Sequence, residues 1–512
     1  MKRMTALVLA LLLALSVFPA LADDFSYPME PITLTINMAE DTTVVPDYAK
    51  DYYFWDLLDD KTGVTLEYTG AAFPYSTVTE EFQLMLASLE YPDLIQANWY
   101  VFPGGPAAAL EDGYIISLND YAEYMPNYMA ALEADPALNK LLRTDNGDLY
   151  CFSRTNIASL AEVFAGPQIR QDWLEELNLE APKTVQQWHD VLVAFRDQKD
   201  ASAPFSMEAR WIFVQNVGNA LSSPWGTIYG FYMDGTDVKF GPMEPAFKEF
   251  VATMAQWYQE GLIDKDFASV DKATVEAKFA GGDTGICIQQ KSCTQNAINA
   301  NTNNPGFKVA ALYTPVLHEG DTREFGQVTA PGSAGGSVSI SSQCKNIEAA
   351  CRFLDYFWTE EGGKFASLGT EGVSYETVDG HPQFTKLVAE NPDGLSFAAA
   401  RNLFSRVTWP HLHNDLDVYD TNETLREMVK VWSDTNMLAH LYPAITPTVE
   451  ESDAITSTYT TIDTYCKEMI VKFIIGMEPM DRYDAFVDQL KALGIEDVLT
   501  VRQAMYDRFL AR

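Results

Sequence analysis

The chain contains few of the residues that metal and redox sites use. Only 6 cysteines and 6 histidines occur among 512 residues. There is no C-x-x-C and no H-E-x-x-H spacing, which argues against a zinc or thioredoxin-like site. His411 and His413 are the closest histidine pair, and on a strand they would share a face, but the sequence identifies no further ligands. We therefore predict no metal and no cofactor.

Sequence motifs for nucleotide binding and acyl transfer are also missing. Gly362-Gly363-Lys364 is followed by Phe365 rather than by Ser or Thr, so it is not a P-loop. The glycine-rich stretch at 331–336 lacks the G-x-S-x-G spacing. The 72 acidic residues supply many carboxylate pairs, but no pair stands out as a glycosidase site. We therefore predict that the chain is not an enzyme.

Basic residues are scarce. The chain has 35 Lys and Arg against 72 Asp and Glu, a net charge of −37. Such a surface repels nucleic-acid phosphates and anionic membrane faces. This balance argues against a nucleic-acid partner and favours solubility outside the cell.

Long hydrophobic runs are absent after the first residues. Lys2 and Arg3 precede an apolar run at 6–17, and Ala20 and Ala22 form an A-x-A cleavage signal. We expect 1–22 to be a signal peptide, with the exported chain starting near Asp23 in the extracellular or periplasmic space. No cysteine that could carry a lipid lies near this site, so the mode of anchoring stays open.

The six cysteines permit disulfides in an exported protein but do not form a dense framework. Cys344 and Cys351 are seven positions apart, which on a helix separates them by about 10 Å, beyond disulfide reach. Cys287 and Cys293 could pair only if the chain turns between them. We expect most of the cysteines to be buried free thiols.

The first hundred residues alternate strand and helix patterns. Strands are predicted at 31–38, 64–68 and 92–95, and helices at 52–58 and 82–89. This order is typical of an α/β domain with a mainly parallel sheet. Ligands of such sheets bind outside the carboxyl ends of the strands, so the loops at 40–43 and 98–100 are candidate site loops.

The segment at 170–195 predicts two helices with a break between them. Trp173, Leu174 and Leu177 lie on one helical face. Asn178 favours the left-handed conformation that ends a helix. Thr184 is followed three residues later by Gln, as in a capping box that starts the next helix.

This segment resembles the D-W-L-x-x-L-x-L-x-x-P-x-T pattern of extracellular solute-binding proteins of bacterial ABC importers, of the carbohydrate-associated family 1. Four further segments resemble the family in the expected order and extend the resemblance over about 30–510: GYIISLND at 113–120, EGLIDKDF at 260–267, GTEGVSY at 369–375 and the C-terminal helices.

The resemblance implies an α/β, two-lobed periplasmic-binding-protein-like fold with a ligand cleft between the lobes. The expected division is 23–155 in lobe 1, 156–310 in lobe 2, 311–385 returning to lobe 1, and a C-terminal helical part at 386–512 mainly in lobe 2. The implied function is capture of a carbohydrate by hinge closure and its delivery to the transmembrane subunits of an ABC permease, by a protein expected to be a monomer.

Other interpretations stay open at this stage. A secreted glycan-processing enzyme and an extracellular sensor or adhesion protein of the same fold both fit the sequence, and so does a peptide or another polar solute. Aromatic rings that stack on sugars and polar groups that bond their hydroxyls define the candidate ligand contacts. These are Asp41, Trp99, Tyr100, Arg210, Trp211, Trp225, Gln289, Glu371, Tyr375 and Trp409.

Overall fold

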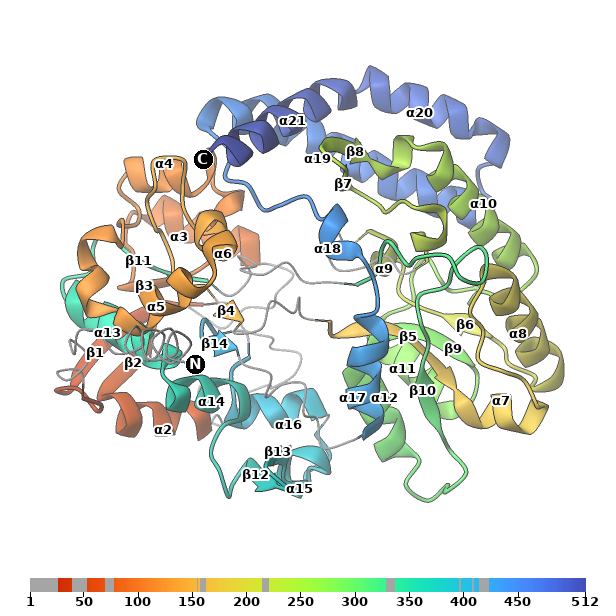
Figure 1. Ribbon diagram of the computed structural model, residues 1–512, viewed down its shortest axis with the longest axis horizontal. Coiled ribbons are helices and arrows are strands. Elements are labelled where there is room, and N and C mark those ends of the chain that lie inside the picture. The colour runs from red at the N-terminus through yellow and green to blue at the C-terminus, as the bar shows by residue number, and fades with distance from the viewer. Residues whose placement is uncertain are drawn as a thin grey trace, which may run out of the picture.

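Two four-stranded sheets with helices packed around them form the two halves of the molecule (Figure 1). The coordinates are a computed structural model. It describes residues 26–38, 53–69, 78–153, 155–156, 163–213, 221–327, 337–395, 397–407, 409–413 and 423–512.

The first sheet has the order β11-β3-β1-β2. Strands β1 (Ile32–Asn37), β2 (Val64–Tyr68) and β3 (Leu94–Gln96) run parallel, and β11 (Val338–Ile340) is antiparallel to β3. Helices α2 (Tyr53–Thr62) and α3 (Val78–Ser88) make the crossovers that parallel strands require. The predicted strand–helix alternation is therefore confirmed for the described part of this lobe.

The second sheet has the order β10-β5-β9-β6. Its strands are β5 (Ala165–Arg170), β6 (Phe205–Ser206), β9 (Ile286–Gln290) and β10 (Val309–Ala311). Strand β9 runs parallel to β6 and antiparallel to β5, and β10 is antiparallel to β5.

The predicted helix break at 178–184 is confirmed in its details. Helix α7 (Gln171–Leu177) ends at Asn178, whose φ of 53° is left-handed. Helix α8 (Val185–Gln198) begins with a capping box in which the Thr184 side chain accepts from the Gln187 amide and the Gln187 side chain accepts in return. Trp188, Leu192 and Phe195 of α8 are buried in the second lobe.

Three helices at the C-terminal end run along the upper side of the second lobe toward the first (Figure 1). They are α19 (Val449–Ile474), α20 (Tyr483–Ala492) and α21 (Ile495–Ala511). Helix α19 starts with a second capping box, Thr448 with Glu451. Its buried face joins the second-lobe core, while Arg508 of α21 bonds Asp145 in the first lobe at 2.5 Å.

The remaining elements surround these cores. In the first lobe they are α4 (Gly105–Glu111), α5 (Pro126–Ala134), α6 (Pro136–Leu141), α13 (Ile347–Asp355) and α14 (Glu360–Leu368). In the second they are α9 (Arg210–Phe213), β7 (Phe231–Asp234), β8 (Asp237–Phe240), α10 (Pro245–Gln259), α11 (Lys272–Gly281), α12 (Lys291–Ala300), α17 (Glu423–Trp432) and α18 (Met437–His440).

A small unit lies at the lower side between the lobes (Figure 1). It comprises β12 (Tyr375–Val378), β13 (His381–Phe384), α15 (Lys386–Ala389) and α16 (Phe397–Phe404). Phe404 stacks on Tyr53 of α2 with ring centroids 5.0 Å apart, and Asn299 of α12 donates to the Ala389 carbonyl at 3.1 Å. The unit therefore touches both lobes.

The hydrophobic cores divide the chain at different places from those expected. The first-lobe core takes residues from Met29 to Phe152, then from Val338 to Ala366, and Trp409. Leu312 still belongs to the second-lobe core, and Phe325 packs on Tyr232 of β7. In the described residues, the first-lobe core therefore resumes at Val338 rather than at 311, and beyond 385 it includes Trp409, while the small unit has a core of its own.

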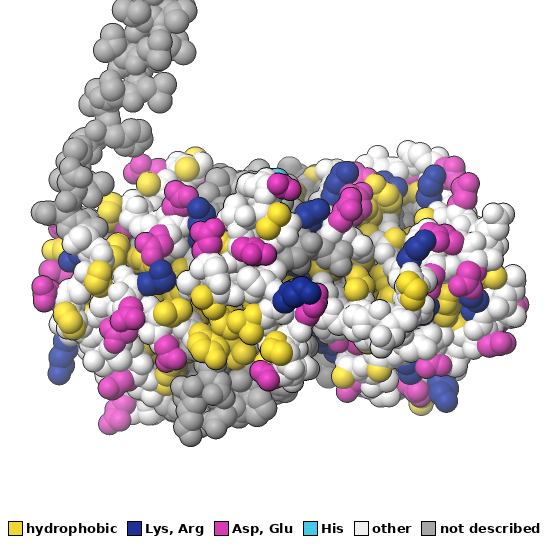
Figure 2. All heavy atoms as spheres, turned by 90° about the horizontal axis from the view of Figure 1, so that it is seen from below, with side chains coloured by type: hydrophobic (Ala, Val, Ile, Leu, Met, Phe, Trp, Pro, Cys, Tyr) yellow, Lys and Arg dark blue, Asp and Glu magenta, His cyan; other side chains and the backbone are white. Residues whose placement is uncertain are grey.

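All six cysteines are buried and none is in a disulfide. Burial raises the pKa of the Cys287 thiol well above its usual value, and the neighbouring Cys293 thiol adds to the rise. Within the described ranges, no helix combines the length and apolar character needed to cross a bilayer. Seen from below, acidic and basic side chains are scattered over both lobes (Figure 2).

Candidate functional site

In each lobe, the chain arriving from the other lobe enters the sheet at the same side, where the parallel strands have their carboxyl ends. Val338 starts β11 beside Gln96 at the carboxyl end of β3, and the chain reaches it from the second lobe. Ala165 starts β5 beside Gln290 at the carboxyl end of β9, and the chain reaches it from the first. Both edges therefore carry carboxyl ends of parallel strands, where α/β proteins bind ligands. We call them the lobe 1 edge and the lobe 2 edge.

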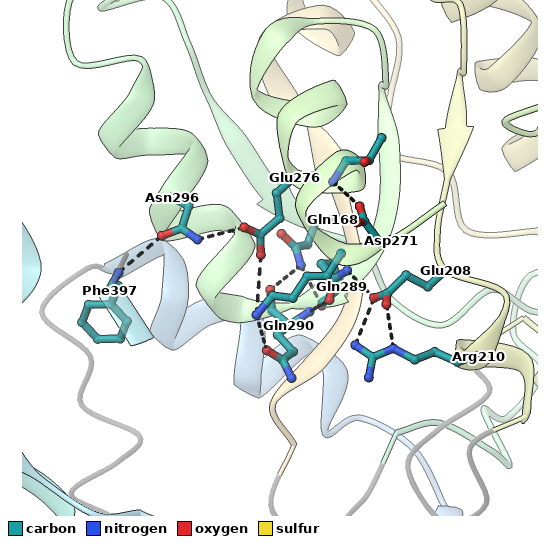
Figure 3. Close-up of polar contacts among 11 residues, drawn as sticks. Gln168, Glu208, Arg210, Asp271, Glu276, Gln289, Gln290, Asn296 and Phe397 are labelled. Carbon is teal, nitrogen blue, oxygen red and sulfur yellow. Dashed lines mark hydrogen bonds and ion pairs between the residues drawn. The ribbon is translucent and has the colours of Figure 1, made fainter. Parts of the chain in front are cut away.

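The lobe 2 edge carries an array of paired polar side chains (Figure 3). Arg210 Nη2 donates to Glu208 Oε2 at 3.0 Å, and Arg210 Nε lies 2.9 Å from Glu208 Oε1 in the same ion pair. Gln289 Nε2 donates to Glu208 Oε2 at 2.9 Å. The Glu208 side chain is 12% exposed and that of Arg210 is 53% exposed. A nearly buried carboxylate thus holds an accessible guanidinium in place.

Amides behind this pair fix its position. Gln168 Nε2 donates to the backbone carbonyls of Gln289 and Gln290 at 2.8 and 3.1 Å, and Thr294 donates to Gln168 Oε1. The Arg210 guanidinium carbon lies 5.1 Å from the centre of the Trp211 ring. These contacts restrict the array before any ligand arrives, which lowers the entropy cost of binding.

The array continues to Asn296 and to Phe397 of the small unit, at the left in Figure 3. Lys272 Nζ donates to Gln290 Oε1 at 3.0 Å and lies 3.8 Å from Glu276 Oε1. Asn296 donates to Glu276 Oε2 at 3.0 Å and accepts from the Phe397 amide at 3.5 Å. Polar contacts therefore run from the lobe 2 edge to α16.

The lobe 1 edge is aromatic instead. Tyr68 ends β2, and its ring meets Trp55 of α2 edge-on at 5.8 Å. Trp409 packs behind Trp55, also at 5.8 Å, and the Arg406 guanidinium lies over the Trp55 ring at 5.3 Å. Trp55 and Tyr68 are half-buried while Trp409 is fully buried. The Trp55 indole nitrogen has no hydrogen-bond partner among the described residues.

Three predicted ligand residues lie together at the lobe 2 edge. Arg210 is accessible, Trp211 is 4% exposed beneath it, and Gln289 is buried with its amide on Glu208. Trp225, also of the second lobe, is half-buried and packs on Phe250 of α10 at 5.7 Å, as part of the hydrophobic core.

Predicted residues of the first lobe lie deeper. The Asn98 side chain accepts from the Tyr100 amide and starts a single 3-10 turn, η2 (Trp99–Val101). This turn leaves Trp99 at 0% exposure against Phe82, 5.1 Å away. The Tyr100 hydroxyl donates to the Ala444 carbonyl at 3.0 Å. Trp409 lies in the same core as Trp99.

The last predicted residues belong to the small unit or lie outside the described residues. Glu371 is exposed and accepts from Thr377 Oγ1 at 2.7 Å. Tyr375 is 7% exposed in the unit's own core. Asp41 falls outside the described residues. Their contact with ligand stays a prediction.

The sequence reasoning missed other residues of the two edges. On the polar side these are Glu208, Gln168, Gln290, Lys272 and Glu276; on the aromatic side they are Trp55 and Tyr68. The strand-end rule was applied only to the first and third strands, and applying it to the strand that ends at Tyr68 would have found this residue. Glu208 follows a two-residue strand, which is too short to be recognised from a pattern.

The histidine pair does not form an open metal site. His411 is buried, with Nδ1 2.6 Å from the Trp409 carbonyl and Nε2 3.1 Å from Ser367 Oγ. Both ring nitrogens are therefore occupied. Among the described residues no three His, Cys, Asp or Glu side chains cluster as metal ligands would.

A hollow of about 780 Å³ lies elsewhere, between α4, the turn at 145–148 and the start of α19. Its walls include the carboxylates of Glu111, Asp120, Asp145, Asp148 and Glu450. Tyr121 is the one aromatic residue among its described lining residues. It therefore offers little stacking surface, and the two edges remain the better candidate site for a sugar.

Comparison with known proteins identifies related chains. A family model described as "Bacterial extracellular solute-binding protein" matches residues 41–364. The fructooligosaccharide ABC transporter substrate-binding protein FusA of Streptococcus pneumoniae is 22% identical over 95% of this chain and 93% of its own. Lipoprotein LipO of Bacillus subtilis is 26% identical over 65% of this chain and 66% of its own, just under two thirds.

Solved structures show the same fold. The alginate-binding protein AlgQ2 without calcium superposes with a TM-score of 0.77, at 23% identity over 93% of this chain and 98% of its own. FusA of S. pneumoniae in complex with kestose gives a TM-score of 0.74, at 21% identity over 94% of this chain and 100% of its own. The predicted two-lobed α/β fold is therefore confirmed.

Proposed function

The chain belongs to the bacterial extracellular solute-binding proteins, which bind solutes rather than convert them, and we propose that it captures an oligosaccharide between its two lobes for an ABC importer. The observation that supports this proposal is the difference between the two edges. One offers aromatic faces and the other offers fixed hydrogen-bonding groups. A sugar has both apolar C–H faces and hydroxyls, and this pairing suits it.

We assign the direct contacts to the accessible groups of each edge. Trp55 and Tyr68 stack on the sugar, and Arg210 with Gln290 bonds its oxygens. Glu208 holds Arg210 in place, and Gln289 in turn donates to Glu208. Trp211 and Trp409 support these surfaces from behind, because each is buried against an accessible residue of its edge.

Capture proceeds by closure of one lobe over a solute already bound to the other. Ligand drives this closure only if it binds the closed form better than the open one. Contact with both edges at once supplies this preference. The aromatic edge alone leaves the hydroxyls of the sugar without partners, and the polar edge alone leaves its apolar C–H faces uncovered. A micromolar affinity, about 8 kcal/mol, is a typical scale for such capture.

Names of related proteins support a carbohydrate as the solute. FusA is named for fructooligosaccharides and has been solved in complex with kestose. Two other solved relatives are named as an alginate-binding protein and an N-glycan transport solute-binding protein. The permease as partner and the space outside the cytoplasmic membrane as location are part of the same proposal. They rest on the family and on the export signal expected at 1–22.

A thermal-shift screen of the chain from Asp23 onward tests the proposal. The screen covers mono- and oligosaccharides, with product analysis of every hit. Ligand that binds only the folded state raises the melting temperature. We expect a shift with at least one oligosaccharide that is recovered intact. Cleavage of the sugar contradicts the binding role, and the absence of any shift across the panel contradicts the carbohydrate assignment.

A further inference from the structure

Two cationic side chains of the lobe 2 edge, Arg210 and Lys272, already lie beside carboxylates. Arg210 forms an ion pair with Glu208, with a hydrogen bond from Nη2 to Oε2. Lys272 lies 3.8 Å from Glu276 and donates to Gln290. Lys291, which begins α12, also has an interaction partner. The edge is rich in charged groups, but its paired charges cancel locally.

An acidic solute needs a cation that is not cancelled. A carboxylate leaving water loses its hydration at a large cost, and only an opposite charge in good geometry returns it. At this edge the carboxylate would lie close to Glu208, which repels it. The start of α12, whose first turn is largely buried, also attracts negative charge, but the repulsion from Glu208 opposes this attraction.

A neutral hydroxyl meets no such penalty. In its ion pair with Glu208, Arg210 places Nε and Nη2 against the two carboxylate oxygens. The guanidinium has five N–H groups in a fixed plane, so three remain as oriented donors to sugar oxygens. Because Glu208 and the Trp211 ring hold that plane, the donors point in set directions.

The net charge of the whole chain also disfavours an acidic solute. Its net charge is −37, and without Lys2 and Arg3 of the expected signal peptide it becomes −39. A field of this sign slows the approach of anions and leaves neutral solutes unaffected. Local pairing and overall charge thus select against the same class of solute.

We infer that the solute is a neutral, hydroxyl-rich oligosaccharide rather than a uronate, and that Glu208 determines this selectivity by neutralising and orienting Arg210. This inference rests on the proposed function and specifies its substrate class. Glu208 acts through Arg210 and is therefore a positioning residue.

Calorimetric titration of the chain from Asp23 onward tests the inference with matched probes. The probes are trisaccharides of glucose, mannose, galactose and fructose, each beside the form whose primary hydroxyls are oxidised to carboxylates. For the wild type we expect the neutral member of the bound pair to bind at least about tenfold tighter, the scale of one charged hydrogen bond. Its affinity should change little with added salt.

Glu208→Gln separates charge from shape, since it keeps the size of the side chain and removes its charge. We expect the ratio of uronate to neutral affinity to rise by about tenfold or more, because Arg210 gains an unmatched charge. Arg210→Gln should weaken the neutral sugar without this rise. Glu175→Gln is the matched control: it removes one acid from an exposed pair with Lys308, 2.6 Å apart, on α7 of the same lobe.

The outcomes separate the inference from the proposed function. A wild type that prefers the oxidised probe overturns the inference while the carbohydrate role stands. An unchanged ratio in a folded, ligand-binding Glu208→Gln variant does the same, as does an equal change in Glu175→Gln. No binding of any probe by the wild type overturns both.

Discussion

The two edges that carry the proposed site are built by different physics. At the lobe 1 edge, Tyr68 packs on Trp55, and Trp55 packs on the buried Trp409. At the lobe 2 edge, Arg210 is held by hydrogen bonds to a nearly buried carboxylate that also accepts from Gln289. Rings give contact area with little direction, and hydrogen bonds give direction with little net energy. We therefore expect affinity to depend mainly on lobe 1 and selectivity on lobe 2.

Removing the ring behind the aromatic edge should have the largest effect. Trp409 is 0% exposed in the first-lobe core, so we expect Trp409→Ala to lower the free energy of unfolding by about 3–5 kcal/mol. Urea denaturation measures this change. Leu438→Ala, at a side chain that is 51% exposed, is the control and should stay within about 0.5 kcal/mol. A stable Trp409→Ala variant that loses only ligand would move Trp409 from support to direct contact.

The buried acid of lobe 1 should make its stability depend on pH. Burial raises the pKa of Asp355 to about 6 although its carboxylate accepts from the Asn127 and Tyr128 amides. The unfolded value is about 3.9, so the folded state binds more protons between these values and stability falls as pH rises through about 6.

Asp355→Asn cannot titrate and isolates this contribution. Relative to the variant, the wild type should lose on the order of 2–3 kcal/mol of stability between pH 4 and pH 7. Urea denaturation of both proteins at several pH values checks this. A constant difference across the range contradicts a raised pKa.

Removing the half-buried ring of Trp55 should mainly affect affinity. We expect Trp55→Ala to weaken binding of the sugar by about 10- to 100-fold, since truncating a central aromatic residue of an interface costs about 2 kcal/mol or more. Calorimetric titration gives the dissociation constant. Tyr313→Ala, which removes an exposed ring that lies under Arg323, should leave it unchanged. Equal effects of the two variants would end the distinction between the edges.

The smallest effect is expected at the guanidinium. Arg210→Ala should weaken the sugar by about tenfold, because one hydrogen-bonding group of net worth about 1–1.5 kcal/mol is lost. Arg196→Ala breaks a surface pair with Asp197 and should change affinity by less than about twofold. A loss at Arg210 larger than at Trp55 would reverse the assignment of affinity to lobe 1.

Much of the fold was predictable because local rules were sufficient. Asn178 ends α7 and the Thr184 capping box starts α8 as their side-chain chemistry requires. Alternation located β1, whose Leu34 and Ile36 are fully buried. Lobe boundaries were less predictable, since the packing of Leu312 depends on contacts between distant segments.

The site was predictable only in part. Arg210 and Gln289 do lie together, but their partner Glu208 has no local signal. Trp99 lies in a loop-like segment, as predicted, yet the turn that Asn98 caps directs its ring inward against Phe82. Composition identifies an aromatic residue in a loop, but only the tertiary fold decides which side of the loop its ring occupies.

Hydrogen–deuterium exchange with and without the best-binding oligosaccharide tests the central claim most directly, since it reports both edges in one experiment. The account predicts simultaneous protection of peptides covering 64–69 in lobe 1 and 205–213 and 286–291 in lobe 2. Protection of a single lobe, or protection centred on the acidic hollow at 446–450, would contradict binding between the two edges.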